Sequence, residues 1–140
     1  MKRSAIKRQP KKKSVGWYKK KLDHSFSQWI RIKDSVNGVA TCVTCGTKND
    51  WKHMQNGHYI ARNHMATRYD EQNCNVQCIG CNMFKNGNMD EYALYLLKKY
   101  GENILVELNK KKQTIRQIRI PEYEELIKLY DNKIKELHAK

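Results

Sequence analysis

Residues 42–82 read CVTCGTKNDWKHMQNGHYIARNHMATRYDEQNCNVQCIGCN, with a Cys-x-x-Cys pair at the start and a second pair just before the final Asn82. Each pair forms a turn that presents two thiolates, so the two pairs can complete a tetrahedral zinc site of Cys42, Cys45, Cys78 and Cys81. A four-thiolate zinc has no free coordination position for water, so we expect a structural ion. The alternative is a thioredoxin-like redox role, but neither pair lies between a strand and a helix of a βαβ unit.

The gap between the pairs, residues 46–77, is longer than simple zinc ribbons need, so it should carry something further. It contains Gly57-His58-Tyr59 and Asn73, and Asn82 directly follows the second pair. Phosphodiester hydrolysis needs an activated water and a cation that stabilises charge on phosphorus and on the leaving oxygen. A neutral imidazole can take the proton of that water, and an amide oxygen suits Mg²⁺ or Mn²⁺. We predict His58 as the general base, Asn82 as a catalytic metal ligand, and Asn73 as a brace for the loop that orients His58.

The stretch 56–88, NGHYIARNHMATRYDEQNCNVQCIGCNMFKNGN, resembles the core of the Rap/NinG family of phage recombination endonucleases, which belongs to the His-Asn-His (ββα-metal) superfamily. The resemblance covers roughly residues 22–101. It implies a small α+β fold in which a zinc-stapled ββα-metal nuclease core has flanking helices. It also implies a metal-dependent endonuclease that cuts branched DNA, such as Holliday junctions or displacement loops, in the cytoplasm of a bacterial host. The family's zinc cysteines, catalytic histidine and helix-opening metal ligand fall on the residues predicted above.

One position departs from the superfamily pattern. Many of these enzymes place an aspartate directly before the catalytic histidine as a metal ligand, and this chain has Gly57 there. A second protein ligand must then come from elsewhere, with Asp70 as the first candidate and His64 as the second. Water can also complete the site, because Mg²⁺ often keeps several waters.

The charge of the chain predicts a nucleic acid as its partner. Twenty-eight Lys and Arg against fourteen Asp and Glu give a formal net charge of +14, and binding to phosphates releases counterions. Arg62, Arg68 and Lys85 flank the predicted site and are candidates for phosphate contacts. A non-catalytic zinc-knuckle DNA-binding protein would explain the charge and the cysteines equally well. Only the order of His58, Asn73 and Asn82 favours the enzyme.

Three segments are predicted along the chain. Residues 1–21 contain ten Lys or Arg and no acid, which indicates a basic flexible arm. Residues 22–101 form the nuclease core, with a helix over 22–36, two short strands before residue 61, a loop over 61–73 and a helix over 89–101. Residues 102–140 form a helical extension. Its amphipathic helix from Pro121 could dock on the domain or pair with a second chain in a homodimer.

The remaining features concern location and the fifth cysteine. The chain opens MKRSAIKRQPKKKS without an apolar run, so we expect neither secretion nor a membrane span. Paired thiols in the reducing cytoplasm favour metal binding over disulfides. Cys74, which belongs to neither pair, is predicted to be a small buried apolar residue.

Overall fold

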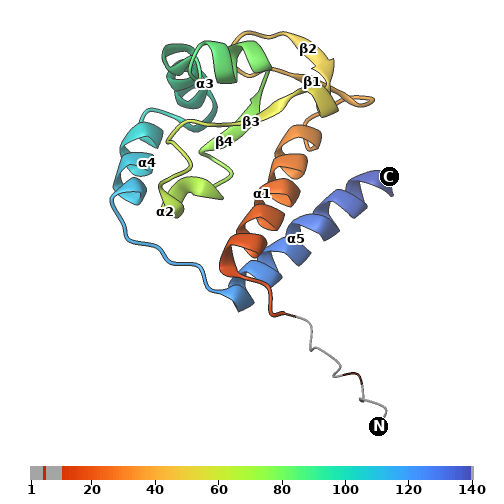
Figure 1. Cartoon of the computed structure of the whole chain (residues 1–140). Coiled ribbons are helices and arrows are strands. Elements are labelled where there is room, and N and C mark those ends of the chain that lie inside the picture. Colours follow the sequence, from red (N-terminus) through yellow and green to blue (C-terminus); the bar gives the residue numbers. More distant parts are fainter. Residues whose placement is uncertain (1–4, 6–10, 140) are drawn as a thin grey trace.

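The computed structural model of the chain describes residue 5 and residues 11–139. Helix α1 (Val15–Ile32) leads into two antiparallel hairpins, and three further helices follow them (Figure 1). In chain order the elements between α1 and the last helix are β1 (Val39–Thr41), β2 (Lys48–Asp50), η1 (Trp51–His53), β3 (Gln55–His58), α2 (Met65–Arg68), β4 (Cys74–Gln77), η2 (Gly80–Phe84), α3 (Met89–Tyr100) and α4 (Ile104–Lys112). Helix α5 (Ile120–His138) is the last.

Helix α1 begins earlier than predicted. The Ser14 hydroxyl caps it by accepting a hydrogen bond from the Trp17 amide at 3.2 Å. Residues 15–21 are therefore helical, although we assigned them to a flexible arm. Residues 1–4 and 6–10 of that arm lie outside the described residues. The helix ends at Ile32, before the left-handed turn of Asn37 and Gly38.

Helix α5 lies along α1, and the two helices bury a shared apolar core (Figure 1). Leu22, Phe26 and Ile30 of α1 meet Tyr123 and Tyr130 of α5 in this core. The rings of Phe26 and Tyr130 pack edge to face at 4.9 Å between centroids. Of the two alternatives for the last helix, the structure shows docking on its own domain. The apolar face of α5 that we considered for a homodimer is covered by α1.

Four short strands replace the two predicted. Strands β1 and β2 pair around the first cysteine pair, and β3 pairs with β4 so that His58 lies opposite Cys74. Every residue of β4 is buried, including Asn75 and Gln77. The sequence analysis placed no strand there, because interior polar residues interrupt the apolar pattern that indicates a strand.

The helices after β4 agree with the predictions for residues 89–101 and 102–112. A second apolar core lies between α3 and α4, where Tyr92 and Leu96 pack against Ile104 and Leu108. The Tyr92 hydroxyl donates a hydrogen bond to the Gly57 carbonyl at 2.6 Å, so α3 is tied to β3. None of the helices in residues 11–139 combines the length and the apolar character that a bilayer span requires.

Candidate active site

The four cysteines of the two pairs converge as predicted. The sulfur atoms of Cys42, Cys45, Cys78 and Cys81 all lie within 4.8 Å of one another, and those of Cys45 and Cys78 are 3.6 Å apart. Zinc–sulfur bonds of about 2.3 Å place the corners of a tetrahedron about 3.8 Å apart. The cluster can therefore hold a zinc ion. Cys74 lies outside it and is fully buried in the α1–α5 core, as predicted.

The surroundings of the sulfurs suit a bound cation. Burial raises the pKa of the Cys42 thiol, but hydrogen bonds from Thr44 and from backbone amides outweigh this and lower the pKa to about 6. Burial raises the pKa of Cys78 to about 12, and hydrogen bonds to neighbouring thiols add to the rise. Four thiolates are hard to bring together without a positive ion, so a bound zinc would favour the deprotonated form of Cys78 that its burial opposes.

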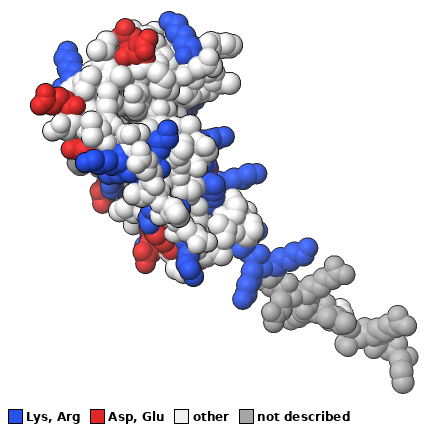
Figure 2. Space-filling model, turned by 90° about the vertical axis from the view of Figure 1, so that its left-hand side faces the viewer, with Lys and Arg blue, Asp and Glu red and all other residues white. Residues whose placement is uncertain are grey.

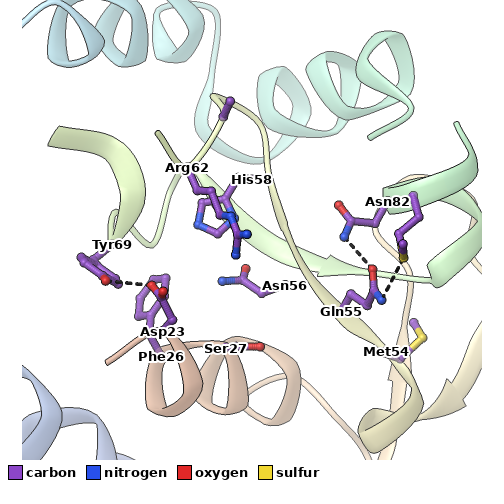
Figure 3. Close-up of a pocket in the computed structure, with 12 residues that line it drawn as sticks. Asp23, Phe26, Ser27, Met54, Gln55, Asn56, His58, Arg62, Tyr69 and Asn82 are labelled. Atoms are coloured by element: carbon purple, nitrogen blue, oxygen red, sulfur yellow. Dashed lines mark hydrogen bonds between the residues drawn. The ribbon is translucent and has the colours of Figure 1, made fainter. Parts of the chain in front are cut away.

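A cleft of about 630 Å³ lies between α1 and the β3–β4 hairpin. Figure 3 shows His58 and Arg62 on one side of this cleft and Asn82 with Gln55 on the other. Asn56 lies between them, and its buried Oδ1 has no hydrogen-bond partner among the described residues. The structure therefore brings together two of the three predicted catalytic residues, His58 and Asn82, at one hollow.

The hydrogen bond of His58 fixes the role of its two ring nitrogens. Nε2 lies 2.9 Å from the backbone carbonyl oxygen of Arg68. A carbonyl only accepts, so Nε2 carries the proton and Nδ1 holds the free lone pair. Burial lowers the pKa of His58 below its ordinary value of 6.5. The imidazole is therefore neutral near pH 7 and able to accept a proton at Nδ1.

The side chain of Arg68 holds that carbonyl in place. Its Nε donates to Asp23 Oδ1 at 2.9 Å, and its Nη1 donates to the Arg62 carbonyl at 2.8 Å. The Tyr69 hydroxyl donates to the same Asp23 oxygen at 2.8 Å. Arg68 is only 7% exposed, so the predicted phosphate contact is wrong for this residue. Its guanidinium links α1 to the turn that carries the hydrogen-bond partner of His58.

Asn73 makes the hydrogen bonds expected of a brace. Its Nδ2 donates to the carbonyls of Ile60 and Thr67, both at 3.0 Å, and its Oδ1 accepts from the Ile60 amide at 2.7 Å. The side chain is fully buried. It therefore joins the beginning of the 59–73 loop to α2. These contacts fix the position of the Arg68 carbonyl relative to His58.

Asn82 is positioned by the second cysteine pair. Its amide donates to the Cys78 carbonyl at 2.9 Å, and its side-chain Nδ2 donates to Gln55 Oε1 at 2.7 Å. With Nδ2 engaged in this way, Asn82 Oδ1 is the atom left to meet a cation in the cleft. Gln55 could not be predicted from the sequence, since only its hydrogen bond with Asn82 distinguishes it from any polar strand residue.

Neither candidate for the second metal ligand lies in this cleft. Asp70 pairs with Lys111 at 2.8 Å and accepts from the Gln72 amide, and it faces a different hollow. His64 lines a third hollow beside α4. The structure therefore does not bring Asp70 to this cleft, because its carboxylate pairs with Lys111 of α4. The acid that does line the cleft is Asp23, which no local motif indicated and which Arg68 already neutralises.

Packing explains why position 57 is a glycine, and the sequence alone does not indicate this. A Cβ at this position would lie 2.0 Å from the Oε1 of the buried Gln77 side chain. Successive strand residues point to opposite faces, so a side chain at position 57 would point away from His58. An aspartate here would fit only if the buried Gln77 side chain moved.

Two of the predicted phosphate contacts remain available. Arg62 is exposed at the cleft, and Lys85 is exposed three residues after Asn82. Figure 2 shows that Lys and Arg are spread over one face among a smaller number of acids, rather than gathered into a single stripe. The basic side chains at the cleft therefore indicate a phosphate-binding position more clearly than the net charge of the chain does.

Comparisons with known proteins identify the relatives of this chain. The family model described as "Bacteriophage Lambda NinG protein" matches residues 1–140. "Protein ninG" of Escherichia phage lambda is 27% identical over 132 residues, which cover 89% of this chain and 59% of the relative. "Protein ninG" of Escherichia phage 933W is 28% identical over 114 residues, which cover 76% of this chain and 54% of the relative. The chain thus spans little more than half the length of these relatives. No solved structure matches it.

Proposed function

We propose that this chain, which belongs to the NinG family, is a metal-dependent endonuclease of the ββα-metal type that cuts branched DNA in the cytoplasm of a bacterial host. The observation that supports the proposal most is the state of His58. Its Nε2 is bound to the Arg68 carbonyl, its lowered pKa keeps Nδ1 unprotonated, and it shares a cleft with Asn82. A surface histidine with no catalytic role would need neither the hydrogen bond from Nε2 to the Arg68 carbonyl nor the loop contacts made by Asn73.

In the proposed reaction, Nδ1 of His58 takes the proton of a water that attacks the phosphodiester bond. The Arg68 carbonyl then stabilises the imidazolium, because its hydrogen bond to Nε2 strengthens when the ring becomes positive. Arg62 holds a neighbouring phosphate at the edge of the cleft. Asp23 takes no proton itself, since its two oxygens are occupied by Arg68 and Tyr69. Asp23 instead positions the Arg68 turn.

The donors in the cleft fit a hard cation such as Mg²⁺ or Mn²⁺. Asn82 lines the cleft, and its Oδ1 is not engaged by the hydrogen bond to Gln55. Asn56 also lines the cleft, with a buried Oδ1 that has no hydrogen-bond partner among the described residues. Such a cation would stabilise the charge on the phosphorus centre and on the leaving oxygen. Neutral amides without a free carboxylate hold Mg²⁺ weakly, so the phosphate of bound DNA would supply the missing negative ligand.

The rival proposal is a zinc-knuckle protein that binds DNA without cutting it. The assay that separates the two incubates the chain with a labelled four-way junction, a flap and a linear duplex, each with Mg²⁺ and with EDTA. Nicking of the branched substrates in Mg²⁺ alone supports the enzyme. Binding to all three substrates with no nicking in either condition would leave only the rival.

Asn82→Ala tests the metal ligand in the same assay. We expect the variant to keep its zinc and its thermal midpoint but to lose cleavage by about a hundredfold or more, because the cation loses its direct protein ligand. Asn132→Ala, an exposed asparagine on α5, is the matched control and should cut normally. Normal cutting by Asn82→Ala, with intact cleavage by the control, would show that another residue holds the metal.

The pH dependence of cleavage tests the general base. Only the neutral form of His58 can accept a proton, so the single-turnover rate should rise about tenfold per pH unit at low pH and then level off. Burial lowers the pKa of His58, so the midpoint of this rise should lie below pH 6.5. The measurement is a rate profile from about pH 5 to about pH 8 at saturating Mg²⁺. A rate that still climbs steeply above pH 7 would assign the base to another group.

A further inference from the structure

An apolar patch beside the cleft is exposed, and its side-chain hydrogen bond among the described residues runs from Gln55 Nε2 to the Met83 sulfur at 3.4 Å. It consists of Ile79, Met83 and Phe84, around the η2 turn, and the Phe84 side chain is 82% exposed and that of Met83 59%. The other phenylalanine, Phe26, is 1% exposed in the α1–α5 core. A single exposed apolar residue is ordinary, but a nearly free aromatic ring within an apolar cluster marks a contact surface.

The patch is held rigidly. Asn86, Gly87 and Asn88 all adopt positive φ, so the chain reverses tightly after η2. The Gly87 amide donates to the Cys81 carbonyl at 2.8 Å, and the buried Gln77 side chain donates to the Gly87 carbonyl at 2.8 Å. The turn is thus fastened to the second cysteine pair and to the interior of β4. A surface fixed in this way loses little conformational entropy when it binds.

The patch also lies next to the proposed site of reaction. Met83 lines the same cleft as His58 and Asn82, and Phe84 is its neighbour in the chain, about 3.8 Å away between Cα atoms. Lys85 follows, exposed and positive. Phe84 is not among the residues that line the cleft, so a DNA strand whose phosphate lies there would reach Phe84 with an adjacent nucleotide by continuing past Met83.

We propose that this patch receives an unstacked DNA base, with Phe84 lying against the face of the base next to the bond that is cut. This inference rests on the proposed function, since it requires DNA in the cleft. Aromatic side chains stack on bases of any sequence, and apolar residues such as Met and Phe enter opened base steps. Base faces are hidden inside an intact duplex and accessible at a branch, so the patch selects branched over linear DNA.

A nucleic acid base fits this position better than a second protein chain does. The patch is small and is followed directly by Lys85, and a chain with a net charge of +14 repels a second copy of itself. A strand of DNA satisfies both features at once, because its phosphates meet the basic groups while one of its bases covers the apolar ones.

The test measures binding without cleavage, in chains that all carry His58→Ala. We expect Phe84→Ala to weaken binding to a four-way junction about tenfold, with less than about a twofold effect on linear duplex of the same sequence. Phe84→Trp should restore junction binding. Leu94→Ala, which removes a 60% exposed leucine from α3, is the matched control and should bind both DNAs unchanged. A fluorescent adenine analogue at the branch should brighten when the chain binds and stay dark with Phe84→Ala.

The remaining outcomes separate a failure of this inference from a failure of the nuclease proposal. Equal junction affinity for Phe84→Ala and its parent would show that the patch does not contact bases. A dimer in sedimentation that Phe84→Ala converts to monomer would assign the patch to a second copy of the chain. If the parent binds the junction through Phe84 but the unaltered chain cuts no DNA, the inference stands and the nuclease proposal fails. Absence of any DNA binding contradicts both.

Discussion

Replacement of His58 by alanine is expected to reduce the single-turnover rate of DNA cleavage by about three orders of magnitude, within the range of 10²–10⁴ that a general base contributes. Without Nδ1 the attacking water must lose its proton to solvent, and the carbonyl of Arg68 has no imidazolium to stabilise. The measurement is the rate of nicking of a four-way junction at saturating enzyme and Mg²⁺, for the unaltered chain and His58→Ala.

The same variant should fold and bind DNA normally, which separates lost chemistry from lost structure. Arg68 keeps its ion pair with Asp23, and the Cys74 thiol still donates to the Arg68 carbonyl at 3.4 Å. That carbonyl is thus not left unsatisfied, and the cost of the substitution should be only about 1 kcal/mol. His53→Ala, on the exposed η1 turn, is the control. A His58→Ala chain that cuts as fast as this control would refute the assignment of the base.

The parts of the site that are close in sequence could be predicted. Two Cys-x-x-Cys pairs impose their own geometry on any chain that binds zinc through them, and Asn82 is placed by its attachment to Cys81. Asn73 could be predicted because a residue that braces the loop after His58 must lie where the chain comes back to the same hairpin. Its side chain does form hydrogen bonds across this loop. In each case a short local connection fixes the position of the side chain.

The parts that depend on docking could not be predicted. Asp23 reaches the cleft because α1 packs against both hairpin strands and α5, and no pattern near Asp23 indicates those contacts. Arg68 and Asp70 are two residues apart, yet the first turns inward to Asp23 and the second outward to Lys111. Charge alone made both look like groups of an active site. The direction of each side chain, and the ion pair that it forms, are decided by the helices that pack beside it.

Gly57 shows why a departure from a motif is not always a loss. From the sequence, the missing aspartate suggested an incomplete metal site with a substitute ligand farther along the chain. The structure places position 57 against Gln77 in the hairpin interior, where any side chain would collide. Packing against Gln77 is therefore sufficient to explain the glycine at position 57.

Loss of the zinc site is expected to have the largest effect on stability. Cys78→Ser should abolish stoichiometric zinc binding and unfold both hairpins with η2, because a structural zinc contributes about 10 kcal/mol or more to the folding of its domain. The apolar cluster around the cysteines is small: its buried members are Ala40, Cys42, Met54, Val76 and Cys81, and two of those are themselves ligands. Such a cluster cannot replace the ion.

The unfolding should be uneven, and this gives the prediction its sharpest measurement. The α1–α5 core has its own seven buried side chains and does not include the zinc cysteines, so hydrogen exchange should lose protection over residues 39–58 and 74–88 first. Cys74→Ser is the matched control: it replaces a buried thiol at a moderate cost of about 1–3 kcal/mol and should keep one zinc per chain. Since His58 and Asn82 both lie within these two segments, Cys78→Ser should also stop cleavage. A Cys78→Ser chain with native exchange in both hairpins would mean that packing alone maintains the site.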